Sequence, residues 1–355
     1  MKFEITRKEK TEINVFPHFS DLKEFPLKAD RYLIIADSLC AKKFPSIISK
    51  IRKKLKAPSF IVKLSAKRKD IYSLQPLFDF MLKSGFSRNS AVIAFGGGST
   101  SDMAGLAAAL FLRGLKFCTI PTTFLSQIDA AFGGKTAADI KGYRNMLGCF
   151  KQPDLVLCFA DIPGEEEIEN SLGELVKYFF LSPESFPEDK ARFLLRIKKD
   201  LYFRSSCIKK CALIKMKAVE KDPLDRGSGE REKLNLGHSA AHALEFASRG
   251  SLSHGEAVML GLEYEFILSR LHHQLNPSFE KKAESYFRLS SGNYSLSNVR
   301  FEDFLKAAGR DKKNRGLKNK FFIFSPSGSI LPAREISIKM LRKAFERLKN
   351  EHTCD

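Results

Sequence analysis

An apolar stretch that runs into three consecutive glycines, at residues 91–112, restricts the folds open to this chain. AVIAF is a run of residues typical of a buried strand, GGG follows it directly, and STSDMAGLAAALFL continues as a small-residue, apolar run typical of a helix. Glycines between a strand and a helix let the backbone approach a ligand closely, and the N–H groups that begin the helix can bind a pyrophosphate. GGGS is not the GxGxxG pattern, and a glycine loop after a strand is often only a tight turn.

Short apolar runs and helical segments alternate through the first half of the chain. Strands are predicted at Tyr32–Ala36, Ser59–Ser65, Ala91–Phe95, Lys116–Thr123 and Leu155–Phe159, with helices between the first two strands and over Ile71–Ser84. This alternation is typical of a parallel sheet covered by helices. From Gly164 onward no strong strand signal appears before KFFIF near residue 320. We therefore expect an α/β domain over residues 1–163 and a mostly α-helical domain over residues 164–355.

The composition predicts a soluble, cytoplasmic protein without a membrane partner. The 355 residues are 43% hydrophobic with no long uninterrupted apolar run, and the N-terminal MKFEITRKEK lacks the apolar core of a signal peptide or membrane anchor. The seven cysteines are an odd number without paired spacing, which indicates reduced thiols. Cys207 and Cys211 can share a helix face, where core packing is favoured over metal binding.

The formal net charge of +19 raises the question of a nucleic-acid partner, because clustered Lys and Arg bind phosphates. The basic residues occur as short scattered runs, with no RNA-binding or helix-turn-helix signature, so no nucleic-acid partner is expected. A small, phosphorylated, anionic substrate accounts for part of the excess through electrostatic steering.

The segment NLGHSAAHALE, with the residues just before it, has the composition of a site. Arg231, Asn235, His238 and His242 are spaced by four, three and four residues, so on one helix their side chains lie along one stripe. The other positions are mostly Leu and Ala, which predicts a helix buried on most sides with its polar face toward a cleft. Histidines one turn apart can bind one metal ion, and His254 can supply a third ligand. The alternative is that two of these three histidines are ordinary core or capping residues.

A carboxylate in an apolar helix is the natural complement to these histidines. Glu174 and Lys177 are three residues apart in SLGELVKYFF, and a surface ion pair explains that spacing by itself. A carboxylate among apolar residues is nevertheless costly unless it is paired or bound to a metal. Both interpretations stay open on the residues alone.

Two other segments are predicted to be loops. Asp129, Lys135, Arg144 and Asn145 lie in glycine-rich sequence between apolar elements, and functional residues are often found on loops. The charged segment Lys221–Arg231 is predicted to be a mobile loop.

The ordered motifs GGGSTSDMAG, RG with PTT, QIDAAFGGKT, GELVKY, NLGHSAAHALE and HGEAV resemble those of 3-dehydroquinate synthase, in the sugar-phosphate cyclase superfamily. The likeness covers roughly residues 30 to 330. The glycine loop is shared with metal-dependent polyol dehydrogenases, whereas GGKT together with GHxxxH and HGE is specific. The resemblance implies an N-terminal Rossmann-like NAD domain, a C-terminal helical metal domain and an active site in the cleft between them.

Carried over by position, the resemblance assigns a set of site residues. The family's metal ligands correspond to Glu174, His238 and His254. Its NAD contacts correspond to Asp37, Lys69, Gly97, Gly98, Ser99, Asp102, Thr122, Thr123 and Asp129. Its substrate and phosphate contacts correspond to Lys135, Asn145, Lys177, Arg231, Asn235 and His242, with Lys312 chosen from the late DKK motif.

The resemblance also implies a homodimer in which Arg113 reaches in from a second subunit. An arginine at the end of an apolar helix would otherwise be buried without a partner, so the interface is expected near Arg113.

This sequence departs from the family pattern at several positions. Ala66 stands where an acid usually holds the cofactor ribose, and Arg144 replaces a lysine. About two residues are inserted before Arg231, which leaves Lys215 and Lys217 as alternatives for one substrate-binding lysine.

The activity implied by the resemblance converts 3-deoxy-D-arabino-heptulosonate 7-phosphate to 3-dehydroquinate and phosphate. NAD would be reduced and reoxidised within each turnover, and a divalent metal, Zn²⁺ or alternatively Co²⁺, would acidify the hydroxyl that is oxidised. The alternatives are another sugar-phosphate cyclase, a metal-dependent NAD polyol dehydrogenase, and a homologue that keeps the fold without catalysis.

Overall fold

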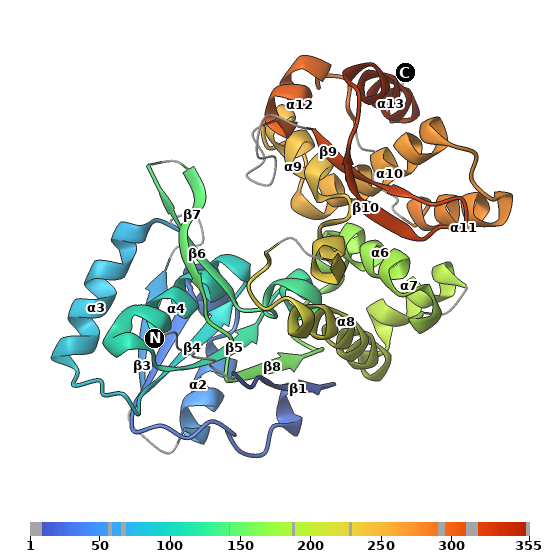
Figure 1. Ribbon diagram of the computed structural model, residues 1–355. Helices are drawn as coiled ribbons and strands as arrows, with labels where there is room; N and C mark the ends of the chain where they lie inside the picture. The colour runs from blue at the N-terminus through green and yellow to red at the C-terminus, as the bar shows by residue number, and fades with distance from the viewer. Residues whose placement is uncertain are drawn as a thin grey trace, which may run out of the picture. The chain divides into compact units, whose positions relative to one another are not determined.

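The computed structural model of the chain describes residues 9–55, 59–64, 69–141, 143–186, 189–226, 229–289, 295–309 and 319–352. The chain forms two compact units (Figure 1). Unit 1 comprises Met1–Gly164 and Asp200–Met216, and unit 2 comprises Glu165–Lys199 and Lys217–Asp355. The division of the sequence at residues 163 and 164 stays a proposal, since Asp200–Met216 of the second half packs with unit 1.

A parallel sheet forms the core of unit 1. Its strands, among the described residues, are β1 (Glu12–Phe16), β2 (Tyr32–Asp37), β3 (Ser59–Leu64), β4 (Ala91–Gly96), β5 (Lys116–Pro121) and β8 (Leu155–Phe159). The order across the sheet is β1-β8-β5-β4-β2-β3, with parallel pairing throughout. The predicted α/β domain is confirmed, and β1 is an edge strand that the sequence did not predict.

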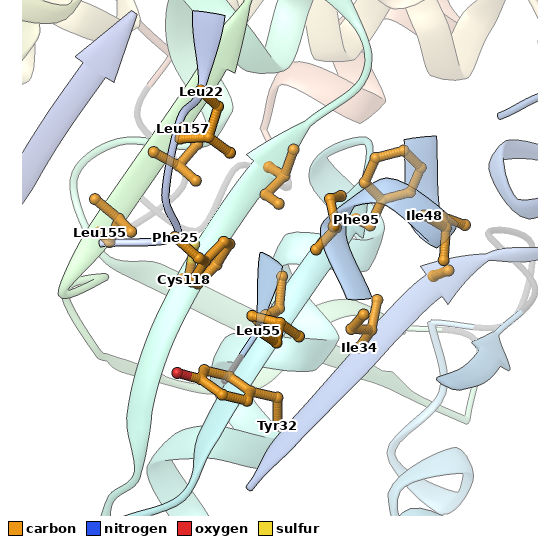
Figure 2. Close-up of a cluster of buried hydrophobic side chains, with 14 of the residues drawn as sticks. Leu22, Phe25, Tyr32, Ile34, Ile48, Leu55, Phe95, Cys118, Leu155 and Leu157 are labelled. Carbon is orange, nitrogen blue, oxygen red and sulfur yellow. The ribbon is translucent and has the colours of Figure 1, made fainter. Parts of the chain in front are cut away.

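Helices cover both faces of this sheet. They are α1 (Ser38–Lys43), α2 (Pro45–Lys54), α3 (Leu74–Lys83) and α4 (Gly98–Leu110). Alternate residues of β2 face opposite sides: Ile34 packs in one apolar cluster with α2, and Ile35 packs in a second cluster with α3 and α4. Figure 2 shows the first cluster, in which Ile34, Ile48 and Phe95 come from β2, α2 and β4. Because both faces are buried, the strands are continuous apolar runs.

An antiparallel hairpin also belongs to unit 1. It consists of β6 (Lys135–Ile140) and β7 (Tyr143–Phe150). The prediction that Asp129, Lys135, Arg144 and Asn145 lie in loops is therefore wrong, since Asp129 lies in the short helix Ser126–Ala130 and the other three are strand residues. Nearly all of β7 is exposed, so its sequence lacks the alternation of apolar and polar residues that marks a half-buried strand.

Unit 2 is mostly helical, as predicted. Its elements are α5 (Glu165–Glu169), α6 (Leu172–Leu181), α7 (Lys190–Lys199), α9 (His238–Ala247), α10 (His254–His272), α11 (Pro277–Phe287), α12 (Phe301–Ala308), α13 (Ile338–Glu351), β9 (Lys320–Phe324) and β10 (Ile330–Glu335). β9 and β10 pair antiparallel, and the largely buried α10 packs against α6, α9, α13 and β9.

The remaining elements are α8 and short turns of helix. α8 (Leu201–Lys221) is divided between the units after Met216, and its Cys207 and Cys211 are buried, which confirms their packing role. The short helices are Phe19–Asp21, Ile71–Ser73, Phe111–Arg113, Ser126–Ala130, Pro183–Ser185 and Gly229–Asn235. Over the described residues, no helix combines the length and the apolar character needed to cross a membrane.

Candidate functional site

Glu174, His238 and His254 lie on α6, α9 and α10 and come together in unit 2. Oε1 of Glu174 lies 3.0 Å from Nε2 of His238 and 3.3 Å from Nε2 of His254. The three ligand atoms all lie within 4.8 Å of one another, a spacing that can hold a metal ion. Two imidazoles and one carboxylate are a ligand set that leaves one position of a tetrahedral metal open for substrate.

Close helix contacts bring these ligands together. Each ligand has a glycine directly before or after it in the sequence. A Cβ on Gly173 would collide with the carbonyl oxygen of Gly255, and a Cβ on Gly255 would collide with that of Asn170. α6 and the start of α10 therefore approach as closely as their backbones allow. Gly237 begins α9 with a φ of 77°, a conformation that glycine adopts without strain.

The second ring nitrogen of each histidine has a hydrogen-bond acceptor. Nδ1 of His238 lies 3.1 Å from the carbonyl oxygen of Leu236, and Nδ1 of His254 lies 3.4 Å from Oε1 of Glu245. A hydrogen on Nδ1 of each ring satisfies these acceptors, so Nε2, which faces Glu174, is the nitrogen that would bind a metal ion. Histidines that bind metals are oriented in this way, and the site therefore fits a metal ion.

The charges at this site depend on burial and on ion pairing. Burial opposes the charge of His254, but its hydrogen bonds with Glu174 and Glu245 raise its pKa to about 10. Burial also opposes ionisation of Glu174, yet the charges of Lys177 and His238 hold its pKa well below the usual range. A metal ion takes the place of the proton on such a histidine, so binding releases protons.

The ion pair between Glu174 and Lys177 is buried. Nζ of Lys177 lies 2.5 Å from Oε2 of Glu174, and both side chains are 1% exposed. The alternative of a surface ion pair is therefore wrong, although the pair itself is present.

The predicted stripe on one helix is wrong. Arg231 and Asn235 lie in the 3-10 helix Gly229–Asn235, and the left-handed Gly237 separates it from α9. His238 and His242 do share α9, but Glu174 and His254 complete the ligand cluster with His238. The ring of the exposed His242 is centred 5.7 Å from that of His238 and 6.4 Å from that of His254, beside the cluster.

Arg231 holds the chain between α8 and α9. It is 3% exposed, and its Nη1 donates to the carbonyl oxygens of Asp222 and Pro223 at 2.7 Å each. Asn235 donates from Nδ2 to the carbonyl oxygen of Glu232 at 2.9 Å. The described part of the predicted loop Lys221–Arg231 is thus organised around a buried guanidinium.

The predicted NAD contacts lie at the carboxyl ends of strands in unit 1. The chain leaves β2 toward β3 and returns to β4 on the other side of β2, and ligands bind in sheets of this kind where the order reverses. Asp37 ends β2, and Gly97, Gly98 and Ser99 follow β4 at the start of α4. Thr122 and Thr123 follow the neighbouring strand β5.

Gly97 and Asp37 each have a defined neighbour at this end of the sheet. A Cβ on Gly97 would lie 3.4 Å from Cγ2 of Thr123, in ordinary van der Waals contact, so Gly97 lies directly beside that threonine. Asp37 accepts from the N–H groups of Leu39 and Cys40 at 2.9 and 3.1 Å and so caps α1.

Two lysines contact the predicted cofactor aspartates. Lys69 donates to Oδ2 of Asp102 and to Oδ1 of Asn145, and so joins α4 to the hairpin. Burial raises the pKa of Asp102, although Lys69 opposes that rise. Nζ of Lys215 lies 3.0 Å from Oδ2 of Asp129, whereas Lys217 is exposed.

Other predicted residues are exposed or undescribed. Lys135 and Arg144 are exposed on the hairpin. Arg113 is also exposed, so the expectation that it would be buried without a partner is wrong. Lys312 and Ala66 lie outside the described residues.

Sequence reasoning missed two carboxylates near the cluster. Glu245 lies seven residues after His238, two turns along one helix face, and that spacing could have identified it. Glu265 lies in the middle of α10, where its sequence context gives no such signal.

The sequence of this chain is similar to those of 3-dehydroquinate synthases over most of its length. The N-terminal sequence model of 3-dehydroquinate synthase matches residues 59–164, and the C-terminal model matches residues 171–314. The 3-dehydroquinate synthase of Alkaliphilus metalliredigens is 31% identical over 309 residues, covering 85% of this chain and 86% of its own length. That of Acinetobacter baumannii is 33% identical over 294 residues, covering 81% and 80%. The bifunctional 3-dehydroquinate synthase/phosphatase of Fusobacterium nucleatum is 32% identical over 93% of this chain, which spans half the length of that relative.

Solved structures share the fold. A 2-deoxy-scyllo-inosose synthase complexed with carbaglucose-6-phosphate, NAD⁺ and Co²⁺ has a TM-score of 0.81 at 21% identity, covering 97% of both chains. A 2-epi-5-epi-valiolone synthase from Streptomyces hygroscopicus with NAD⁺ and Zn²⁺ has a TM-score of 0.84 at 17% identity, covering 99% of both chains.

Proposed function

The chain belongs to the 3-dehydroquinate synthase family, and from this membership we propose that it converts 3-deoxy-D-arabino-heptulosonate 7-phosphate to 3-dehydroquinate and phosphate. It is an NAD- and metal-dependent carbon-oxygen lyase. The cluster of Glu174, His238 and His254 is the observation that supports this activity most directly, because its three ligand atoms lie close enough to hold a metal ion in the part of the chain that matches the family's C-terminal model.

When bound, a divalent metal would supply acidification of the substrate hydroxyl, and NAD would supply reversible hydride transfer. Glu174, His238 and His254 hold the metal, and we propose zinc, because a catalytic zinc commonly has three protein ligands of this kind. His242, exposed beside the cluster, is placed to orient a hydroxyl or to move a proton at its ring nitrogen.

Basic and amide side chains are proposed to bind the substrate's anionic groups. We propose that Lys135, Arg144 and Asn145 on the hairpin, Arg231 and Asn235 before α9, and Lys215 in α8 bind its phosphate or carboxylate. Lys312 joins this proposal from its sequence motif alone. Lys215 is preferred to Lys217 because it lies beside Asp129, a predicted cofactor contact.

Unit 1 is proposed to hold NAD at the switch in its strand order. The N–H groups at the start of α4 suit a pyrophosphate, and Asp37, Thr122 and Thr123 surround that end of the sheet. Lys69, Asp102 and Asn145 form a linked group of polar side chains there.

Two further proposals extend the activity. We propose that the enzyme acts as a homodimer and that Arg113 lies near the interface. Arg113 is exposed, as such a position requires. The location of the enzyme is cytoplasmic, which the scattered, odd-numbered cysteines support.

The test measures phosphate release from the phosphorylated sugar acid by the purified protein. Activity should require NAD, disappear with a strong chelator and return with Zn²⁺. His238→Ala should lower kcat/KM by at least about 1000-fold, or roughly 4 kcal/mol, whereas His272→Ala, which alters an exposed histidine on α10, should leave it unchanged. Full activity in the chelated protein and in His238→Ala would refute the proposed metal site.

A further inference from the structure

Glu265 is fully buried in α10, and its carboxylate binds backbone groups of two other elements. Oε2 accepts from the N–H group of Gly237 at 2.7 Å, and Oε1 accepts from the N–H group of Phe322 in β9 at 3.3 Å. Burial raises the pKa of Glu265 to about 8, and the two hydrogen bonds oppose that rise. A carboxyl group is costly in such surroundings, and a carboxyl oxygen can accept a hydrogen bond in either protonation state.

One peptide group connects Glu265 to a metal ligand. The N–H of the peptide between Leu236 and Gly237 donates to Glu265, and its carbonyl oxygen accepts from Nδ1 of His238 at 3.1 Å. A peptide group is a rigid plane. Holding its N–H end therefore sets the direction of its carbonyl, and with it the orientation of the His238 ring.

This peptide needs such a restraint because glycine follows it. Gly237 has a φ of 77°, and glycine populates positive and negative φ about equally. Rotation of the peptide would remove the acceptor from Nδ1 of His238. The carboxyl group of Glu265 stabilises the one orientation in which the carbonyl faces the ring.

We propose that Glu265 is a positioning residue for the metal centre, acting through the Leu236–Gly237 peptide on His238. Nδ1 of His254 contacts the carboxylate of Glu245 directly. Nδ1 of His238 is connected to the carboxylate of Glu265 through one peptide group. The chain of hydrogen bonds also polarises the imidazole and strengthens Nε2 as a ligand. The inference rests on the proposed metal site.

The experiment measures Zn²⁺ affinity of the full-length, metal-stripped protein by competition with a chromophoric chelator. Glu265→Met removes both acceptor oxygens at similar size, and should weaken the affinity by about 10-fold or more, in the range found for partners of ligating histidines. Glu265→Gln keeps one acceptor oxygen and should bind within about 3-fold of wild type. The visible absorption of the Co²⁺-loaded protein should change in Glu265→Met and be retained in Glu265→Gln.

Ser269→Ala is the matched control. Ser269 lies one turn further along α10, is fully buried, and accepts from the N–H of Phe324 in β9 at 2.8 Å. Its removal disturbs the same helix and strand without altering the Gly237 hydrogen bond, so the affinity should stay within about 3-fold of wild type. Equal weakening in Ser269→Ala, or unchanged affinity and Co²⁺ absorption in Glu265→Met, would overturn the proposal.

Two measurements keep the outcome distinct from failure of the site or of folding. If His238→Ala binds Zn²⁺ as wild type does, the metal site is misassigned; if it loses binding while Glu265→Met keeps it, only the role of Glu265 fails. If Glu265→Met does not fold, hydrogen exchange in the wild type tests whether Glu265 holds the Gly237 amide. The Gly237 amide should then exchange as slowly as amides inside α10, and rapid exchange would overturn the proposal.

Discussion

The charge available at the metal cluster depends on a single lysine. Glu174 and Lys177 are buried together, and their opposite charges offset each other. Breaking a buried pair by removing one partner is strongly destabilising, because the other charge is left in a medium of low polarity. Lys177 therefore stabilises the ionised form of Glu174, the proposed metal ligand.

At the residue scale, Lys135 and Arg144 test how the hairpin binds anions. Lys135 begins β6 opposite Phe150, where the N–H of Lys151 bonds the carbonyl of Gly134 at 2.8 Å, so it lies at the anchored end. Arg144 lies near the turn. We expect Lys135→Met to lower kcat/KM about 100-fold, or roughly 3 kcal/mol, because it removes a charge that we propose binds an anionic group of the substrate.

Arg144→Lys is the comparison for this prediction. It keeps the charge and loses only the bidentate geometry of the guanidinium, so kcat/KM should change by a few-fold. Steady-state kinetics of the two variants side by side provide the measurement. A nearly normal Lys135→Met with an inactive Arg144→Lys would show that the anion-binding roles are reversed.

At the scale of elements, the crossing of α6 and α10 sets the positions of two ligands. Gly255 follows His254 and faces the carbonyl of Asn170 just before α6, where an added methyl group would collide with the backbone. Gly255→Ala should therefore force the helices apart, lower the free energy of unfolding by about 3 kcal/mol, and weaken Zn²⁺ binding. Urea denaturation and metal competition measure the two effects.

Gly164→Ala is the control for that substitution. A Cβ at Gly164 meets no atom within 4 Å, so the free energy of unfolding should change by less than about 0.5 kcal/mol. If Gly255→Ala were as stable as this control and bound Zn²⁺ normally, the helix crossing would not determine the ligand geometry.

The elements differ in how far their sequences predict them. β2, β4, β5 and β8 are buried on both faces, so their apolar runs predicted them closely. β7 is exposed along most of its length, and its pairing with β6 depends on a partner strand rather than on its own pattern. The spacing of His238 and His242 predicted a shared helix face, but only the packing of α6 against α10 brings Glu174 to His238 and His254.

At the scale of the whole molecule, the two units have complementary chemistry. Unit 1 has a parallel sheet whose strand order reverses between β2 and β4, where we propose that NAD binds, and unit 2 has the proposed metal ligands. An enzyme of this family oxidises its substrate and later reduces the product of elimination, so one hydride leaves and returns. The overall reaction therefore has no net oxidation or reduction.

This balance gives a prediction that separates the cyclase from a polyol dehydrogenase of similar fold. Phosphate release should continue for many turnovers with NAD present in amounts below those of substrate, while absorbance from NADH stays at or below the level of one equivalent per enzyme. The same sample followed by phosphate assay and NADH absorbance provides the measurement, with glycerol as a control substrate that should yield neither signal. NADH that accumulated in proportion to product would show that the hydride leaves the enzyme, and the dehydrogenase assignment would then replace the cyclase.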